Sequence, residues 1–331
     1  MIERLHFCAT GRKGLGHLRR ITNIVKVLKQ SAPQLSLNLV TNAPPAGMTT
    51  DEAELYADIS VVERSDMSRH LGEHQAQAVV VDTAVLPGIR ELNAKLGLLL
   101  RETRDSQVHR FALEEGRLWD LLMIPNPPDH WQPGKQSVPA LCIEALGWIY
   151  RHSEDRAGQP GAPLPAVSRL LIASGGGGSG DEFPVEVERL INALKLQPNL
   201  SFTVSQVIGP RAGESDGIAA ADEYLRPGPK LHELFPRFDL VISTAGYNST
   251  LELACTDVPV LFIPVEKTYD DQAGRARYWA SRLGHCHRPM QLDSSLEWAV
   301  RILALRKRRA PVDLDASGAI RAAEILREWL Q

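Results

Sequence analysis

One stretch of the chain, residues 239–272, is compatible with only a few folds. It begins with the apolar run Leu-Val-Ile at 240–242, whose short length and branched side chains are typical of a strand buried on both faces of a parallel sheet. Small residues follow, then a short helix, a second apolar run at 258–264 and a polar loop. This succession predicts a β-α-β unit, and ligands of such units lie beyond the carboxyl ends of the strands.

The turn and helix of this unit carry the first candidate ligand contacts. A glycine in the turn lets a ligand approach the backbone closely. Any of three polar residues at the start of the helix can cap it, and the first helical N–H groups then remain available to an anion. A glutamate lies in the first turns of the helix, on the side that faces the loop. These candidates are Gly246, Asn248, Ser249, Thr250 and Glu252.

The chain opens with a similar pattern of strand, glycine turn and helix. An apolar run at 5–9 leads into the sequence GRKGLGH, and a helix with one apolar face is expected over 18–30. Gly14 and Gly16 place backbone near a ligand, and His17 closes the turn. The glycine spacing is not GxGxxG and no acidic residue follows at the position that a ribose requires, which disfavours a dinucleotide site. His17 is a catalytic candidate, with a structural helix cap as the alternative.

A third turn of this kind begins the second half of the chain. The apolar run at 170–173 ends in SGGGGSG, and a helix is expected over 184–196. Five glycines in so short a segment cost much chain entropy unless their conformational freedom or their lack of a side chain is used. Gly175, Gly176 and Gly177 are therefore candidates for binding an anionic group, with a merely flexible loop as the alternative.

Asp82 stands at the carboxyl end of another buried apolar run, at 78–81. A carboxylate at this position can hold one nitrogen of a neighbouring imidazole, which fixes the tautomer and supports the charge gained when the other nitrogen takes a proton. Capping a helix expected over 87–95 is the alternative role.

The apolar pattern divides the chain into two parts. Residues 150–168 are rich in proline, glycine and charge and contain little to bury. We therefore predict an N-terminal domain over 1–149, a linker over 150–168 and a C-terminal domain over 169–331. A chain of 331 residues is long enough for two domains that each bury a core.

Composition excludes several classes of protein. A net charge of -3 argues against a nucleic-acid binder that relies on phosphate neutralisation. Neither a signal-peptide pattern nor an apolar run of 18 residues is present, so we expect a cytoplasmic protein without a transmembrane segment. The four cysteines have no metal-binding spacing and are expected to be buried free thiols. The basic run at 306–309 is expected to be a solvated helix end, with peripheral membrane contact as the lesser alternative.

The stretch 239–272 resembles the C-terminal signature of GT-B glycosyltransferases, specifically the family-28 group that includes the enzyme adding N-acetylglucosamine to lipid I. In that resemblance Glu252 matches the glutamate that binds the ribose hydroxyls, and Asp271 and Gln272 match the loop that binds the donor sugar. The glycine turn at 175–177 matches the turn that approaches the donor diphosphate. The sequence GLGHLRR resembles a group of predicted bacterial glycosyltransferases, in which the histidine of a Gly-x-Gly-His turn reaches the interdomain cleft.

This resemblance implies an α/β protein of the GT-B fold, with two Rossmann-like domains facing each other across a cleft and a last helix that crosses back to the N-terminal domain. It implies transfer of a sugar, with inversion, from a nucleotide diphosphate donor to an acceptor hydroxyl, UDP being the expected carrier. His17 would be the base and Asp82 the residue that orients it. The donor is a substrate, so no cofactor is expected, and no DxD-type metal site is evident. The acceptor is a small-molecule, lipid-linked or natural-product hydroxyl compound.

Two alternatives remain at the level of sequence. A UDP-sugar hydrolase of the kind found in pseudaminic acid synthesis shares the fold and the Gly-x-Gly-His turn and uses water as the acceptor. A non-catalytic protein that binds a nucleotide-sugar is a different class. Release of free sugar would identify the hydrolase, and donor binding without turnover would identify the binding protein. The sequence does not specify the acceptor, because variable loops on one fold select it.

Overall fold

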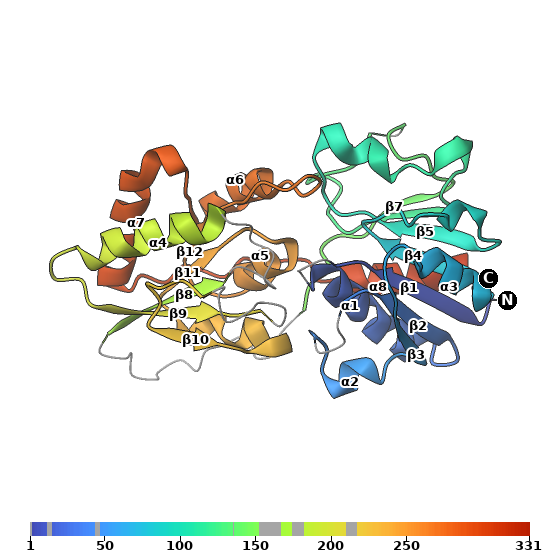
Figure 1. Ribbon diagram of the computed structural model, residues 1–331, viewed down its shortest axis with the longest axis horizontal. Helices are drawn as coiled ribbons and strands as arrows, with labels where there is room; N and C mark the ends of the chain where they lie inside the picture. The colour runs from blue at the N-terminus through green and yellow to red at the C-terminus, as the bar shows by residue number, and fades with distance from the viewer. Residues whose placement is uncertain are drawn as a thin grey trace. The chain divides into compact units, whose positions relative to one another are not determined.

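The computed structural model describes residues 2–11, 15–43, 47–134, 136–151, 167–173, 182–209 and 217–331. The chain divides into two compact units, each a parallel sheet covered by helices (Figure 1). Unit 1 comprises Met1–Arg151, Thr268–Asp270 and Asp315–Gln331, and unit 2 comprises His152–Lys267 and Asp271–Leu314. Most of the expected linker lies outside the described residues, as do four of the candidate glycines, Gly14, Gly175, Gly176 and Gly177.

Unit 1 is built on a seven-stranded sheet with the order β3-β2-β1-β4-β5-β6-β7. Every neighbouring pair is parallel. The order reverses between β1 and β4, because the chain first adds strands on one side of β1 and then on the other. The strands are β1 (Arg4–Ala9), β2 (Ser36–Thr41), β3 (Asp58–Val61), β4 (Ala78–Asp82), β5 (Lys95–Leu99), β6 (Leu121–Ile124) and β7 (Ile143–Ala145).

Both faces of the unit 1 sheet are buried. Successive side chains of a strand point to opposite faces, so Phe7 joins the core under one set of helices and Cys8 the core on the other face. The last helix of the chain belongs to the first core, where Leu326 is fully buried, and it lies beside α1 (Figure 1). The helices are α1 (Gly16–Ser31), α2 (Thr50–Ala53), α3 (Met67–Glu73) and α8 (Gly318–Trp329), with 3₁₀ turns η2 (Ile89–Glu91), η3 (Asp105–Phe111) and η4 (Glu114–Gly116).

Unit 2 has a six-stranded sheet with the order β10-β9-β8-β11-β12-β13, again parallel throughout. It repeats the plan of unit 1, and the order reverses between β8 and β11. These two sheets confirm the expected α/β fold class. The strands are β8 (Ser168–Ala173), β9 (Phe202–Val207), β10 (Glu223–Leu225), β11 (Leu240–Ser243), β12 (Val260–Phe262) and β13 (Gly284–Cys286).

One core of unit 2 lies between its sheet and two helices, α4 and α7, where Leu190 and Ile242 are fully buried. The unit contains the helices α4 (Glu182–Lys195), α5 (Tyr247–Ala254), α6 (Gln272–Leu283) and α7 (Leu292–Leu305), with 3₁₀ turns η6 (Gly228–Glu233), η7 (Phe235–Arg237) and η8 (Pro289–Gln291).

The predicted helix over 87–95 is wrong. The segment 87–95 forms only η2, because Gly88 adopts a left-handed conformation with φ 73° and β5 already begins at Lys95. The segment 230–235 lies in 3₁₀ turns rather than an α-helix. Prolines at 227, 229 and 236 remove backbone donors there, and Gly228 has φ 56°.

The cysteines and the basic run also differ from expectation. Cys8 is buried, but Cys142 is exposed and the other two thiols are half-buried. The basic run is not a solvated helix end, because Arg306 and Arg308 form ion pairs with the nearly buried carboxylate of Asp239. Within the described residues, no helix is both long and apolar enough to cross a membrane.

Candidate functional site

In an open parallel sheet, the loops diverge where the strand order reverses, and a ligand crevice forms beyond the carboxyl ends of those strands. Unit 1 reverses between β1 and β4, and unit 2 between β8 and β11. His17 lies in the helix that follows β1, and Asp82 is the last residue of β4. Gly246 follows β11 in unit 2. The topology therefore brings sequence-predicted residues to the switch point of each sheet.

His17 and Asp82 are in contact in unit 1. The His17 Nδ1 atom lies 3.2 Å from Asp82 Oδ1, and the carboxylate is fully buried while the imidazole keeps 24% of its side-chain surface exposed. Arg20 binds the same carboxylate, with its Nε donating to Oδ2 at 3.0 Å and its Nη2 to Oδ1. Burial alone would raise the pKa of Asp82, but the positive charge of Arg20 and the contact with His17 outweigh it and lower that pKa to about 2.

The residue after Asp82 is held in an unusual backbone conformation. Thr83 has φ 45°, a left-handed value that costs a β-branched residue about 1–3 kcal/mol. Its hydroxyl lies 2.8 Å from Asp82 Oδ1 and 3.1 Å from the Leu99 carbonyl oxygen, and its N–H donates to that carbonyl. Thr83 thus gives the carboxylate another hydrogen-bonding neighbour at the end of β4.

The sequence reasoning did not find Arg20 or Thr83. Arg20 was visible in principle, because it lies three residues after His17 in the same helix, and residues at that spacing share a helix face. The role of Thr83 depends on its backbone angle, for which the sequence carries no signal.

Part of the loop after β12 belongs to unit 1. The carboxylate of Asp270 accepts a hydrogen bond from Arg101 Nη1 at 2.7 Å, and both side chains are mostly buried. Tyr269 packs edge-on against Phe111, with ring centroids 5.9 Å apart. Arg101 therefore engages the carboxylate of Asp270 within unit 1.

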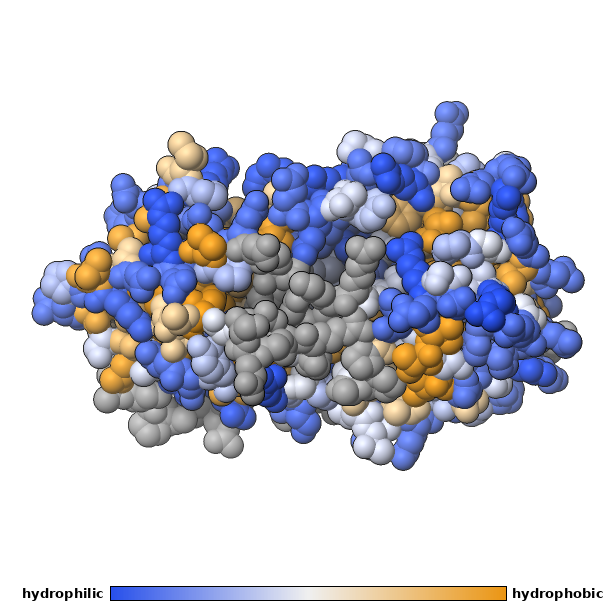
Figure 2. All heavy atoms as spheres, in the orientation of Figure 1, coloured by the Kyte–Doolittle hydropathy of each residue, from blue (hydrophilic) through white to orange (hydrophobic). Residues whose placement is uncertain are grey.

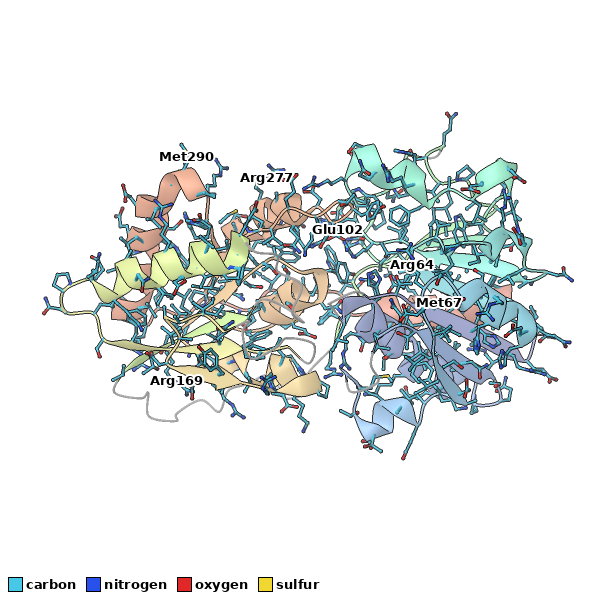
Figure 3. The ribbon with its side chains drawn as sticks, viewed as in Figure 1. Arg64, Met67, Glu102, Arg169, Arg277 and Met290 are labelled. Carbon is cyan, nitrogen blue, oxygen red and sulfur yellow. The ribbon has the colours of Figure 1, made fainter. Side chains whose placement is uncertain are left out.

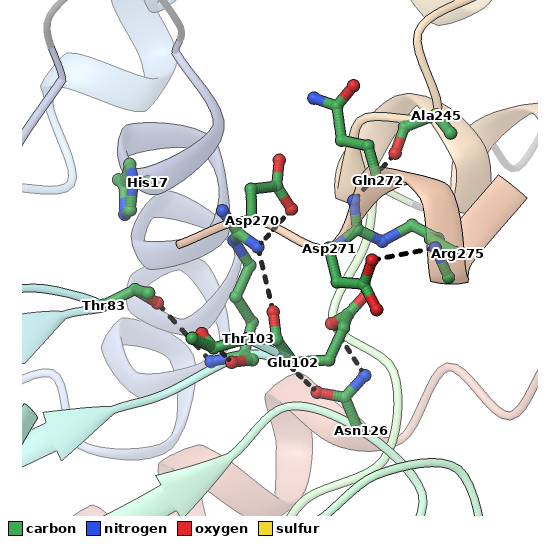
Figure 4. Close-up of polar contacts among 12 residues, drawn as sticks. His17, Thr83, Glu102, Thr103, Asn126, Ala245, Asp270, Asp271, Gln272 and Arg275 are labelled. Atoms are coloured by element: carbon green, nitrogen blue, oxygen red, sulfur yellow. Dashed lines mark hydrogen bonds and ion pairs between the residues drawn. The ribbon is translucent and has the colours of Figure 1, made fainter. Parts of the chain in front are cut away.

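A second buried carboxylate lies beside Arg101. The Asn126 side-chain amide donates to Glu102 Oε2 at 3.0 Å and its oxygen accepts the Glu102 N–H at 3.2 Å (Figure 4). Glu102 follows β5 and Asn126 follows β6, and both side chains are nearly inaccessible. Polar residues therefore continue along the carboxyl edge of the unit 1 sheet beyond Asp82.

The turn of unit 2 between β11 and α5 is also strained. Ala245 has φ 61°, and its carbonyl accepts a hydrogen bond of 2.7 Å from the Nη1 of the buried Arg275 (Figure 4). The expected cap at Asn248, Ser249 or Thr250 is wrong. The helix begins earlier, at Tyr247, with Gly246 as the N-cap and without a side-chain cap hydrogen bond, so these three residues lie inside α5.

Nothing in unit 2 itself requires glycine at position 246. Its φ is -63°, which any residue adopts, and a Cβ built there meets no heavy atom of the described residues within 4 Å. The hydroxyls of Ser243 and Thr250, at the ends of the elements that flank the turn, are buried and have no hydrogen-bond partner among the described residues. Buried polar groups are rarely left unpaired, so these two need an explanation.

The remaining donor candidates have defined positions in unit 2. Glu252, Asn248 and Ser249 are half-buried on α5. Asp271 is the N-cap of α6 and accepts the Gly274 N–H at 2.9 Å. The side-chain oxygen of Gln272 accepts the Val265 N–H at 3.2 Å. Both residues of the expected sugar loop thus also shape the start of α6.

Arg309, from the basic run, supports α5 at its other end. Its Nη2 donates to the Leu253 carbonyl at 2.6 Å and its Nε to the Val258 carbonyl at 2.9 Å. A cation at a helix C-terminus stabilises the helix dipole and satisfies its last carbonyls. Burial lowers the pKa of Arg309 to about 10, so it stays charged at neutral pH.

Comparison with known proteins gives matches in structure only. No family model matches the sequence, and no curated protein matches it. MurG from Acinetobacter baumannii is 15% identical, with 98% of this chain and 99% of that chain covered and a TM-score of 0.55. A UGT transferase from Siraitia grosvenorii, solved with UDP, is 13% identical, with 99% and 100% covered and a TM-score of 0.56.

A Listeria monocytogenes protein assigned as a UDP-N-acetylglucosamine 2-epimerase is 10% identical, with 100% of this chain and 97% of that chain covered and a TM-score of 0.62. Likeness at such low identity is evidence of fold, and this fold carries more than one reaction. The expected resemblance to MurG and other GT-B glycosyltransferases is confirmed at that level. The chain has the GT-B fold.

Proposed function

We propose that this protein is a glycosyltransferase that moves a sugar from a nucleotide diphosphate donor, with UDP as the expected carrier, to an acceptor hydroxyl. One observation carries the proposal: the histidine and carboxylate predicted as a catalytic pair are in contact at the switch point of the unit 1 sheet. The glycine turn and helix N-terminus at the switch point of unit 2 support it. The glycosyltransferases among the structures that share the fold add to that support.

In this proposal, the contact with Asp82 supports a role for the Nε2 nitrogen of His17. Asp82, with its pKa lowered to about 2, is ionised at neutral pH and only accepts hydrogen bonds. The proton of neutral His17 therefore lies on Nδ1, and Nε2 keeps a lone pair. An acceptor hydroxyl has a pKa far above neutral, so its attack needs such a base within reach. Arg20 keeps the carboxylate in place while the imidazole gains a proton.

Unit 2 supplies the donor site in this proposal. The N-cap of α5 is a glycine without a side-chain cap hydrogen bond, and the dipole of this helix favours an anion at its start. Glu252 binds the ribose hydroxyls and the glycines at 175–177 approach the diphosphate, while Asp271 and Gln272 contact the sugar. The bare backbone at Gly246 leaves room for the phosphates.

The reaction is then a single displacement. The acceptor oxygen forms a bond to the anomeric carbon as the bond to the diphosphate oxygen breaks, and the configuration inverts. The hydroxyl proton goes to His17 Nε2, and the electron pair leaves with the nucleoside diphosphate. Backbone N–H groups and helix dipoles stabilise the charge of the leaving group, so we expect turnover without a divalent metal.

Hydrolysis remains the alternative with the same donor site, and water then replaces the acceptor. A direct assay separates the possibilities. The protein is incubated with UDP-sugars in EDTA, with and without a panel of hydroxyl acceptors, and UDP, free sugar and glycosylated product are each measured. Product that requires an acceptor supports transfer, and free sugar without an acceptor supports hydrolysis. Tight donor binding without UDP release supports a binding protein. Activity lost in EDTA and restored by magnesium would overturn the metal-free mechanism.

The donor placement has its own test. Glu252→Ala should weaken UDP binding by about 1–3 kcal/mol, because buried polar partners of the ribose are left unsatisfied. Calorimetry on the folded variant measures this, and Glu233→Ala, an exposed change in η6 of the same unit, is the matched control. Equal UDP affinity for Glu252→Ala and the original protein would place the nucleotide elsewhere.

A further inference from the structure

Unit 2 contains a pocket of about 830 Å³ to which the proposed transfer assigns no role. It lies between the first turns of α4 and one face of α6, over the carboxyl ends of β12 and β13. We refer to it as the α4–α6 pocket. Of the two helices, α4 packs beside α7 and α6 packs beside α5. Its volume falls within the range of pockets that hold small organic ligands, roughly 300–1,000 Å³.

The α4–α6 pocket has a described wall that differs from the candidate donor turn after β11. The donor turn follows β11, whereas the pocket is built on the next two strands of the sheet. Its described wall contains none of the donor candidates of α5, nor Asp271 or Gln272. Arg275 faces the donor turn, while Arg277, two residues later on α6, contributes to the pocket wall.

Most of the pocket surface is apolar. Phe183 from α4, Ile263 and Val265 from the end of β12, and Pro289 after β13 line it. Val185, also on the wall, is 63% exposed, and Met290, which follows Pro289, is 95% exposed. Figure 2 shows hydrophobic residues between hydrophilic ones on this unit, and Figure 3 shows the side chains of Met290 and Arg277 directed to the outside. The wall of the α4–α6 pocket can therefore contact the apolar part of a ligand.

Two arginines give the pocket positive charges without protein partners. Arg277 and Arg288 lie on its wall, and neither side chain forms a hydrogen bond or ion pair among the described residues. Both lie close to the Cys286 thiol. Burial raises the pKa of that thiol, and the two guanidinium groups oppose the increase. Exposed arginines beside an apolar cavity match a ligand that carries a carboxylate or phosphate.

Two acidic residues of α4 also line the pocket. Glu186 on α4 is held by His287, with Oε2 3.2 Å from Nε2, and His287 Nδ1 lies 2.8 Å from the Ser295 hydroxyl. This buried histidine therefore fixes Glu186 against the protein. Glu182 is exposed in the first turn of α4, where the helix dipole favours it. The negative charge of the pocket therefore comes from α4, and its positive charge comes from α6 and the segment after β13.

We propose that the α4–α6 pocket binds a small amphipathic anion, with its apolar body against Phe183, Ile263 and Val265 and its carboxylate or phosphate group between Arg277 and Arg288. The proposal does not depend on sugar transfer, because it concerns a different set of strand ends in unit 2. A fatty acid and a lipid phosphate share this chemistry, and the experiment separates them.

Binding to the full chain is measured by calorimetry with decanoate, decyl phosphate and decanol. The two anions should bind at least about tenfold more tightly than decanol, since a charge-assisted hydrogen bond is worth about that much. Stronger binding of decanoate identifies a carboxylate ligand, and stronger binding of decyl phosphate identifies a phosphate ligand. Equal or tighter binding of decanol would overturn the role of the arginines.

The double variant Arg277→Gln, Arg288→Gln should bind the preferred anion about tenfold more weakly and leave decanol binding unchanged. Arg282→Gln is the matched control, because Arg282 lies on the same helix, contacts the Tyr278 carbonyl and is not part of the pocket wall. Since Arg277 and Arg288 are exposed, the double variant should fold normally. Unchanged anion binding in the double variant would refute the proposal.

Cysteine modification locates the ligand within the chain. The preferred anion should slow the reaction of Cys286 with N-ethylmaleimide, measured by mass spectrometry of the peptides. The exposed Cys142 of unit 1 is the internal control and should react at the same rate with or without the anion. An unprotected Cys286, or displacement of the anion by UDP, would place the ligand outside the α4–α6 pocket and contradict the inference.

Discussion

The two units repeat one strand order but use its switch point differently. In unit 1 the point between β1 and β4 is occupied by charged groups that hold one another: Arg20 and His17 both contact the buried carboxylate of Asp82. In unit 2 the point between β8 and β11 is followed by a turn with a bare glycine at 246 and by helical N–H groups without a side-chain cap.

We propose that this difference reflects two roles within the proposed function. A carboxylate fixed by Arg20 and Thr83 is in place before any substrate arrives, so little reorganisation is needed when His17 gains charge. A helix that starts at a glycine N-cap favours, through its dipole, a ligand that brings its own negative charge. One plan therefore yields a prepared proton acceptor in unit 1 and a prepared anion site in unit 2.

The largest effect that tests this comparison is expected at His17. His17→Ala should lower turnover by about 100- to 10,000-fold, the usual contribution of a positioned base. Donor affinity should stay the same, because the donor site belongs to unit 2. Steady-state kinetics and UDP calorimetry on the same protein measure the two quantities separately.

Asp82→Asn serves as the companion change, with a smaller loss of turnover if Asp82 only orients the imidazole. Near-normal turnover in His17→Ala would leave His17 with only a structural role, as a neighbour of the buried Asp82 carboxylate. A His17→Ala protein that has lost UDP affinity would contradict the separate roles proposed for the two units.

The next effect is a pH dependence of unit 1 that arises at another histidine. His6 in β1 is buried, and burial with the nearby charges of Arg4, His74 and His70 lowers its pKa to about 4, while Asp58 opposes this. The folded-state pKa lies below the unfolded value of 6.5, so the unfolded chain takes up the proton first. The stability from neutral His6 is complete above 6.5 and is lost as the pH falls towards 4.

Between about pH 7 and about pH 5, unit 1 should lose roughly 2 kcal/mol of stability from this residue. Hydrogen exchange of the β1 and β2 amides at the two pH values measures the loss. His6→Leu should remove most of it, and His109→Gln, a change at an exposed histidine of the same unit, should retain it. An unchanged pH dependence in His6→Leu would assign the effect to other groups.

Strong local patterns made much of this structure predictable. The buried strands at 78–82 and 240–243 follow from short apolar runs, and the long amphipathic helices follow from side-chain periodicity. Three-residue strands such as β10 and β13 are too short to show a period and were not predicted. The helix expected at 87–95 was wrong because a left-handed glycine outweighed helix propensity.

Site residues were predictable where the residue type itself indicates a chemical role. They were much less predictable where the role depends on a long-range contact or on a backbone angle. His17 and Asp82 could be proposed because imidazole and carboxylate at strand ends suggest proton transfer. The Arg101 contact with Asp270 joins residues 169 positions apart, and the left-handed Ala245 arises from the path of the chain. Neither leaves a local mark in the sequence.

The smallest expected effect concerns the glycine that unit 2 does not need. Gly246→Ala should leave the melting temperature nearly unchanged, because φ is -63° and the added methyl group meets no described atom within 4 Å. The weaker N-cap preference of alanine and the lower entropy of its unfolded chain act in opposite directions. UDP binding should weaken about tenfold, because the methyl group occupies the space through which the phosphates approach the backbone.

Gly318→Ala in unit 1 makes the matched contrast. Gly318 also begins a helix, but a Cβ there would lie 2.4 Å from the Trp148 carbonyl oxygen, and backbone cannot yield cheaply. This change should lower the melting temperature by several degrees, the shift that roughly 1–2 kcal/mol produces, and leave UDP affinity intact in the protein that remains folded. Calorimetry with UDP and a thermal melt give a UDP affinity and a melting temperature for each of the two variants. The comparison of the two units holds if Gly246→Ala changes only UDP binding and Gly318→Ala changes only stability. It fails if Gly246→Ala binds UDP as tightly as the original chain. In that case the turn would not be the place where a ligand meets the backbone.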